Sequence, residues 1–242
     1  MTPTGRATGS ILSAMAAAGI FRLGGTLVGT NAFRLYEGEL GVRLPLGGMA
    51  NTGDIDIAQF EKLSVALQDQ VEPGLAETFS ALKFDPVPGL GKGRTWRWAQ
   101  EGSGQLVEFL TPAFGDETIR DLQALGVGAQ ALNYLNFLIA EPIHAAAIYR
   151  SGVLVQVPRP ERYAIHKLII AARRRDGAGS LKPVKDREQA AFLIKAMAED
   201  RLDDLAAAYA TATEAGPRWR EHIGNSLKRM PETKAILESL GA

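Results

Sequence analysis

The chain has 242 residues, of which 46% are hydrophobic and 22% are charged, and its formal net charge is zero. This length suits one large domain or two small ones, and the apolar content can build a buried core. Because the chain has no cysteine, a disulfide framework, a thiol nucleophile and thiolate zinc sites are excluded. The lack of cysteine also favours a cytoplasmic protein. No apolar run of about 18 residues occurs, so we expect no membrane span and no membrane partner.

Residues 1–10 are polar and contain glycine, which predicts either a disordered start or the remnant of a longer N-terminus. An alanine-rich apolar stretch then predicts a helix at 11–19. It lacks the small-residue cleavage site of a signal peptide, so we interpret it as part of the fold. A short strand is expected at 26–28.

The turn after this strand reads Gly29-Thr30-Asn31 and leads into a predicted helix at 31–39. Thr30 or Asn31 is a suitable N-cap for that helix. Gly29 lets the backbone approach a phosphate, Thr30 can donate a hydroxyl hydrogen bond to it, and free N–H groups at a helix start favour the same anion. An ordinary strand-to-helix turn is the alternative interpretation.

A glycine-rich segment with a short strand at 42–46 precedes a predicted strand at 54–58, which begins Asp54-Ile55-Asp56. Residues i and i+2 of a strand share a face, so both carboxylates point one way and Ile55 points into the core. Two like charges side by side are unfavourable unless a cation lies between them. The pattern therefore predicts a divalent metal site, the alternative being a strand end with two solvated acids.

A third acid stands in an apolar strand predicted at 105–110, where Glu108 is the single charged residue. A lone carboxylate in such a strand is costly unless it is paired or ligates a metal. Glu108 is therefore a third candidate ligand. A partly buried salt bridge to Arg97 or to a nearby lysine is the alternative explanation.

Between these acidic strands we expect a helix at 61–70 and a flexible loop at 85–94. Residues 95–98 then form a hairpin with 105–110. Trp96 and Trp98 lie on one face of that hairpin, which indicates packing.

The rest of the chain predicts a helical stretch at 116–139 and a strand at 152–157, followed by helices alone. Strands first and helices last predict an α+β fold with a domain of residues 1–158 and a helical domain of residues 159–242. The predicted C-terminal helices cover residues 160–175, 186–199, 201–213, 217–228 and 231–240.

Residues 159–187 carry nine Lys or Arg against three acids, which favours a polyanionic substrate such as a nucleotide. A solvated helix face is the alternative interpretation. The histidines His144, His166 and His222 show no metal-ligand spacing and are interpreted as structural.

The order Val28-Gly29-Thr30, then Asp54-Ile55-Asp56, then a strand carrying Glu108 resembles the nucleotidyltransferase fold of the DNA polymerase β superfamily. The chain is most similar to bacterial nucleotidyltransferase-like proteins that include abortive-infection-type toxins, over roughly residues 20–200. The resemblance implies a small mixed nucleotidyltransferase-type sheet flanked by helices, followed by a helical C-terminal half. Two departures are the 23 residues between Thr30 and Asp54, and a glutamate where aspartate is commoner.

This resemblance implies a metal-dependent nucleotidyltransferase that moves an NMP from a nucleoside triphosphate (NTP) to a hydroxyl acceptor. The acceptor would be an RNA end, a protein side chain or a small molecule. Asp54, Asp56 and Glu108 would be the catalytic residues and the ligands of two Mg²⁺ ions, with Mn²⁺ as an alternative ion. Glu108 would also help to activate the attacking hydroxyl.

Gly29, Thr30 and Asn31 would bind the nucleotide, together with two lysines of the helical half. Lys167 would contact the triphosphate, unless it is a surface lysine snorkelling beside the core. Lys185 would reach a phosphate, and the next residue, Asp186, is a suitable N-cap for the following helix.

The resemblance to toxins further implies an action on a translation component and allows for a cognate inhibitor protein as a partner. The alternative function is a non-catalytic module that retains the nucleotidyltransferase fold and binds a nucleotide or another protein. Glu108 and the long segment before Asp54 motivate this second interpretation.

Overall fold

The computed structural model describes residues 1–45, 53–66, 69–88, 94–174 and 181–240. Its internal contacts divide the chain into two compact units. Unit 1 comprises Met1–Glu39 and Asn51–Pro158, and unit 2 comprises Leu40–Ala50 and Arg159–Ala242. Strands of the described chain all belong to unit 1, and the predicted α+β class is confirmed. No helix within these described ranges is long and apolar enough to cross a membrane.

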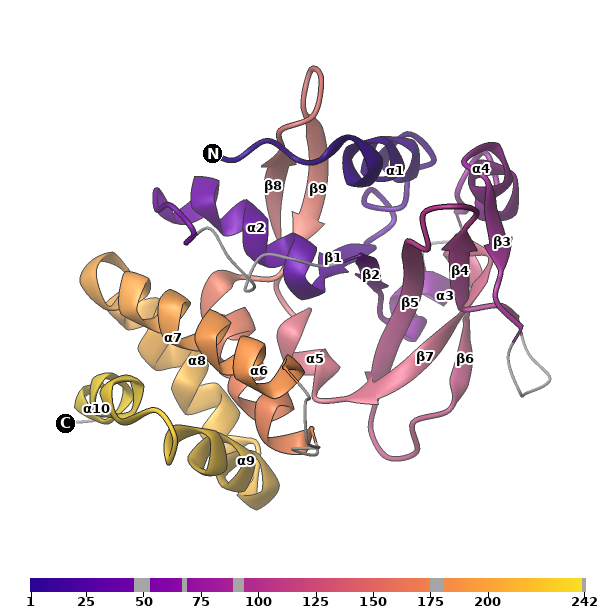
Figure 1. The fold of residues 1–242 in the computed structure, drawn as a ribbon. Coiled ribbons are helices and arrows are strands. Elements are labelled where there is room, and N and C mark those ends of the chain that lie inside the picture. Colours follow the sequence, from indigo (N-terminus) through magenta and orange to yellow (C-terminus); the bar gives the residue numbers. More distant parts are fainter. Residues whose placement is uncertain (46–52, 67–68, 89–93, 175–180, 241–242) are drawn as a thin grey trace. The chain divides into compact units, whose positions relative to one another are not determined.

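Unit 1 is built on a mixed seven-stranded sheet, in which the path β1-β2-β5-β4-β3 is extended by β7, which pairs with β5 and β6 (Figure 1). Strands β2 and β5 are parallel, whereas β1 is antiparallel to β2 and β4 is antiparallel to β5. The strands are β1 (Thr26–Val28), β2 (Asp54–Ala58), β3 (Phe84–Pro86), β4 (Arg97–Gln100), β5 (Leu106–Ala113), β6 (Ile119–Leu122) and β7 (Val127–Asn133).

One face of this sheet is the core of unit 1. The side chains of Ile55, Ile57 and Val107 are fully buried there. Next to them lies an aromatic cluster with ring centroids 5.1 to 6.1 Å apart, made of Phe79, Phe84, Trp98 and Phe109. Trp98 thus has the packing role that the sequence predicted, and the alternate positions of β2 and β5 are left to the opposite face.

The remaining elements of unit 1 include a two-stranded antiparallel sheet, whose second strand packs against α1 and β1. Its strands are β8 (Ile143–Ala147) and β9 (Val153–Val157). The helices of unit 1 are α1 (Arg6–Ala17), α2 (Gly29–Leu40), α3 (Glu61–Ala66), α4 (Leu75–Ala81), η2 (Gln123–Leu125) and α5 (Leu135–Leu138).

Two sequence predictions for unit 1 are wrong. Residues 116–139 are not a helical stretch but form β6, η2, β7 and the short α5, because β7 pairs with both β5 and β6 and this pairing overrides local helix propensity. Residues 1–10 are not disordered: α1 already begins at Arg6, and the Thr4 amide donates to the Ile148 carbonyl at 2.9 Å.

Other boundaries differ less. The helix predicted at 31–39 spans Gly29–Leu40, and the strand predicted at 54–58 is β2 with the same bounds. Residues 42–45 of the predicted strand 42–46 have no regular structure, and residue 46 lies outside the described residues. Residues 67–68 of the predicted helix 61–70 and residues 89–93 of the predicted loop lie outside as well. Elements α4, β3 and β8 were not predicted.

The described residues of unit 2 form five helices near their predicted positions, and Figure 1 labels them α6 to α10. Proline occupies the first turn of four of them, where its missing N–H costs nothing. Helix α6 packs against α7, α8 and α9, which is why it is buried on most of its surface. The helices are α6 (Pro160–Arg173), α7 (Lys182–Asp200), α8 (Leu202–Glu214), α9 (Pro217–Leu227) and α10 (Pro231–Ser239).

Candidate functional site

The turn between β1 and α2 requires glycine at position 29. Gly29 has a φ of +66°, a conformation that residues with a side chain rarely adopt. In addition, a Cβ atom added to Gly29 would overlap a carboxylate oxygen of Asp56. The backbone of this turn therefore lies directly against the second aspartate of β2, which joins the glycine motif and the acidic motif in one site.

Thr30 and Asn31 are buried in the first turn of α2, with exposed fractions of 8% and 6%. The prediction that one of them is the N-cap is wrong, because α2 already begins at Gly29. The Asn31 side-chain amide instead donates a hydrogen bond of 2.7 Å to the backbone carbonyl of Asp54. Asn31 thus fastens the first residue of β2 to the start of α2.

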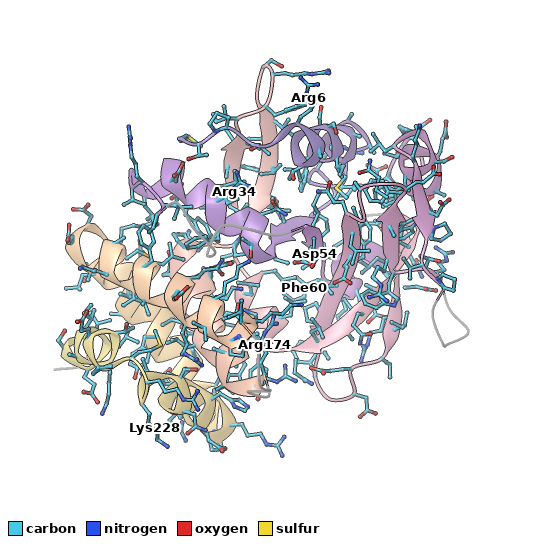
Figure 2. All side chains as sticks on the ribbon, viewed as in Figure 1. Arg6, Arg34, Asp54, Phe60, Arg174 and Lys228 are labelled. Carbon is cyan, nitrogen blue, oxygen red and sulfur yellow. The ribbon has the colours of Figure 1, made fainter. Side chains whose placement is uncertain are left out.

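Asp54, Asp56 and Glu108 lie on one face of two neighbouring strands, and we call this group the acidic face (Asp54 is labelled in Figure 2). Asp54 and Asp56 are half-buried, whereas Ile55 between them is fully buried on the opposite face. In the parallel register of β2 and β5, Asp56 stands directly opposite Glu108. The structure therefore places the three acids that the sequence singled out on one face of the sheet, with Asp56 and Glu108 as direct neighbours in the register.

Glu108 also forms an ion pair with Arg97, which the sequence analysis gave as the alternative to metal ligation. The Arg97 Nη1 atom lies 3.4 Å from the Glu108 Oε1 atom, and the two residues are directly opposite each other in the antiparallel register of β4 and β5. Arg97 thus adds one positive charge to the edge of the acidic face.

The acidic face has the donor chemistry that Mg²⁺ and Mn²⁺ prefer, namely carboxylate oxygens. Within the ranges that the structure describes, no cluster of three or more His, Cys, Asp or Glu side chains is arranged to hold a metal ion. The aspartate pair fits a metal by its chemistry and its shared face. Glu108, the third candidate ligand, is paired with Arg97 in this structure.

Lys167 and Lys185 belong to unit 2. The Lys167 ammonium group is 2.6 Å from the Asp186 Oδ1 atom, and both side chains are almost entirely buried. Arg174 at the end of α6 (labelled in Figure 2) also pairs with Asp186, at 2.9 Å from the Oδ2 atom. Lys167 is therefore not a surface lysine, and one buried carboxylate is shared between two cations.

The prediction that Asp186 is an N-cap is wrong, because α7 begins at Lys182 and Asp186 lies inside its second turn. An upstream proline, Pro183, starts the helix earlier than the lysine-aspartate pair suggested. Lys185 is half-buried on the same helix. The role of Asp186 as an ion-pair partner was missed, since no local pattern connects positions 167 and 186.

His166 lies beside Lys167 in the buried part of α6, and its Nε2 atom has no hydrogen-bond partner. Burial, and after it the positive charges of Lys167, Arg173 and Arg174, together lower the pKa of His166 from 6.5 to about 3. Burial beside three cations therefore keeps the His166 imidazole neutral, and its interpretation as a structural residue stays a prediction.

A glycine turn against an aspartate pair on a mixed sheet defines a nucleotidyltransferase-type fold. The sequence profile of a family described as Nucleotidyltransferase matches residues 6–214, and the chain belongs to that family. A search of curated proteins gave no match.

One solved structure with a similar fold is the crystal structure of an antigenic nucleotidyltransferase-like protein from Paracoccidioides brasiliensis. Its TM-score to this chain is 0.50 at 14% sequence identity, and the match covers 98% of this chain and 95% of that chain. At this identity the similarity concerns the fold alone.

Proposed function

We propose that the protein is an active, metal-dependent nucleotidyltransferase that moves an NMP from an NTP to a hydroxyl acceptor. The observation that carries the proposal is the acidic face: Asp56 stands opposite Glu108 on parallel strands, and the Gly29 backbone lies against Asp56. Membership of the nucleotidyltransferase family supports it. An NTP-consuming reaction also favours the cytoplasm.

In the proposed reaction, the acceptor hydroxyl oxygen forms a bond to the α-phosphorus, and the bond from that phosphorus to the β-phosphate oxygen breaks. Pyrophosphate leaves, and the hydroxyl proton passes to a carboxylate, for which Glu108 is the candidate. Asp54 and Asp56 would hold Mg²⁺ or Mn²⁺, which when bound neutralises charge on the attacking and leaving oxygens. The protein mainly positions the reactants and stabilises their charge.

The residues around the turn have distinct proposed roles. The backbone of Gly29 and the first turn of α2 would contact a phosphate, since the N–H groups at a helix start favour anions. Asn31 keeps Asp54 in position through its hydrogen bond to the Asp54 carbonyl. In unit 2, phosphate contacts by Lys167 and Lys185 rest on the family resemblance.

Among the possible acceptors, the positive charge of residues 159–187 favours a nucleic acid. Residues 159–187 carry a clear excess of Lys and Arg. Part of this charge is balanced inside unit 2, because Lys167 and Arg174 pair with Asp186. We therefore propose an RNA end as the first acceptor to test, with a protein side chain or a small molecule as the others. A toxin role and an inhibitor partner stay predictions.

The test is a label-transfer assay with Mg²⁺, each of the four α-labelled NTPs in turn, and a cell extract that supplies RNA and protein acceptors. We expect label on a macromolecule with the parent protein and none with Asp56→Ala. Asp116→Ala is the matched control, because it removes an exposed acid of unit 1 outside the acidic face. Equal transfer by the parent and Asp56→Ala would show that the acidic face is not the catalytic site.

A second candidate function is a nucleotide-binding module without turnover, and the ion pair between Arg97 and Glu108 favours it. While Glu108 stays paired with Arg97, the arginine charge makes its carboxylate a weaker base for the acceptor hydroxyl. This candidate predicts that the protein binds an NTP in equilibrium dialysis yet releases no pyrophosphate with any acceptor. The enzyme predicts both binding and pyrophosphate release.

A further inference from the structure

A row of three charged residues crosses the sheet beside the turn at Gly29. Asp56 of β2 is directly opposite Glu108 of β5, and Glu108 is directly opposite Arg97 of β4. Side chains that are directly opposite each other on adjacent strands point to the same face and lie within contact distance. The order along the row is therefore acid, acid, base, with the arginine at the end away from the glycine turn.

Arg97 is held at this place by its surroundings. Its guanidinium carbon lies 5.0 Å from the centre of the Trp96 ring, within the range of a cation–π contact. Its Nη1 atom pairs with Glu108, whereas its Nε atom is buried without a hydrogen-bond partner. The side chains of Arg97 and Glu108 keep exposed fractions of 37% and 23%, so solvent and ions can reach the pair.

We propose that Arg97 is a positioning residue of the acidic face, which holds Glu108 while no cation is bound and competes with a divalent cation for that carboxylate. The proposal rests on the proposed function, since it takes the acidic face as the metal site. In the metal-free protein, Arg97 offsets the repulsion between Glu108 and Asp56. A bound cation would compete with the guanidinium for the Glu108 carboxylate.

Two physical consequences follow. Removal of the Arg97 charge removes one competitor for the Glu108 carboxylate and a positive charge that repels the cation, so metal affinity rises. The same change removes an attractive charge from beside two neighbouring acids, so the metal-free protein becomes less stable. A residue that merely packed against Trp96 would lower stability without raising metal affinity, which separates the two roles.

The experiment measures Mn²⁺ binding without nucleotide, by electron paramagnetic resonance of free Mn²⁺ and by titration calorimetry. We expect Arg97→Met to bind Mn²⁺ at least about threefold more tightly than the parent protein. This factor corresponds to the small free energy of a half-exposed ion pair that no longer competes for Glu108. Arg97→Lys keeps the charge and should bind within about twofold of the parent protein. Arg97→Gln serves as the second neutral variant if Arg97→Met does not fold.

Two controls identify the carboxylate through which Arg97 acts. Arg120→Met breaks a different arginine–glutamate pair of unit 1, between Arg120 and Glu61 at 3.1 Å and of similar exposure, and should leave Mn²⁺ affinity unchanged. In a Glu108→Gln background, Arg97→Met should raise the Mn²⁺ affinity less, because the carboxylate for which Arg97 and the cation compete is absent.

Tighter binding by Arg97→Met that depends on Glu108 supports the proposal. Equal or weaker binding overturns it, and so does an equal gain in the Glu108→Gln background, which would indicate a long-range charge effect. If binding is abolished by Asp56→Ala, these outcomes leave the proposed metal site standing. If no variant shows binding that depends on Asp56, the metal site itself fails, and the role of Arg97 fails with it.

Discussion

The acidic face of unit 1 and the ion-pair network of unit 2 have opposite charge balances. On the acidic face, three carboxylates share a surface with Arg97, and the side chains are half-buried. In unit 2, Asp186 is shared by Lys167 and Arg174, and its side chain is only 5% exposed. One region has an excess of acid near solvent, and the other has a buried carboxylate between a buried lysine and a half-exposed arginine.

This difference determines what each region can do. Half-buried like charges can remain unbalanced because water screens them, and such a surface gains stability when it binds a cation. A buried charge is costly when its partner is missing, so the network of unit 2 stays folded mainly because its members pair with each other. The acidic face is suited to binding a ligand, and the buried network is suited to fixing the packing of α6 against α7.

The largest expected effect is the loss of the shared carboxylate in unit 2. Asp186→Ala leaves the Lys167 and Arg174 charges without their partner, and removal of one partner of a buried pair costs about 3 kcal/mol or more. Urea unfolding measures this free energy. Glu238→Ala, which breaks an exposed pair with Lys234 at 3.5 Å, is the control and should cost under about 1 kcal/mol. Equal costs for both variants would contradict the comparison.

The second effect is a pH dependence that arises from His166. Its pKa is about 3 in the folded protein against an ordinary value of 6.5, because of burial and then the neighbouring cations. The unfolded chain therefore takes up a proton first, so stability is fully present above pH 6.5 and falls as the pH drops from 6.5 towards 3. The expected loss from this residue between pH 7 and pH 5 is about 2 kcal/mol.

His166→Leu should remove this part of the pH dependence, measured as the difference in unfolding free energy between pH 7 and pH 5. The exposed His144 of β8 provides the control variant His144→Leu, which should keep the dependence of the parent protein. An unchanged slope in His166→Leu would mean that another buried group titrates in its place.

The third effect concerns the glycine turn, where two glycines with nearly the same backbone can be compared. Gly29 and Gly126 have φ values of +66° and +67°, but a Cβ at Gly126 meets no atom within 4 Å, whereas one at Gly29 overlaps Asp56. Gly126→Ala should cost about 1–2 kcal/mol through backbone strain alone. Gly29→Ala should cost more and should also abolish label transfer.

Unfolding curves and the transfer assay check both glycine variants. If Gly29→Ala retains full transfer, the close approach of the turn to Asp56 has no role in activity. If Gly126→Ala also loses label transfer, backbone strain alone would account for the loss in both variants. The close approach of Gly29 to Asp56 would then not be needed to explain the effect of Gly29→Ala.

The elements around the site could largely be predicted because their signals are local. Alternating apolar and acidic residues located β2 with its observed bounds, and periodic apolar residues located the five described helices of unit 2 to within a few residues. The aspartates share a face for the same reason, since the period of a strand is two residues. Gly29 could be identified because few residues tolerate such a turn.

The parts that could not be predicted depend on contacts between distant positions. Residues 127–133 are rich in alanine, yet they form β7 because β5 and β6 provide partners on both sides. The pair of Lys167 and Asp186 joins residues 19 apart on two helices, which no periodic pattern encodes. The carbonyl contact of Asn31 likewise needs the folded turn. Local patterns thus give the elements, and pairing across the fold gives the charge balance of each site.

The smallest expected effect is the most direct test of the contrast between the two regions. Asp54→Asn removes one like charge from the acidic face, while the Asp54 backbone carbonyl that accepts the hydrogen bond from Asn31 remains. In EDTA the variant should be as stable as the parent or more stable by about 0.5 kcal/mol, because like charges on one strand face repel.

In millimolar Mg²⁺ the order of stabilities should reverse, since the parent gains the binding free energy of the cation and Asp54→Asn gains less of it. Thermal unfolding midpoints of both proteins with EDTA and with Mg²⁺ measure the change of sign. The exposed control Asp116→Ala should keep the same offset from the parent in both conditions. If Asp54→Asn is equally destabilised with and without Mg²⁺, the aspartate is a structural residue like Asp186, and the distinction between a face that binds and a network that packs would be lost.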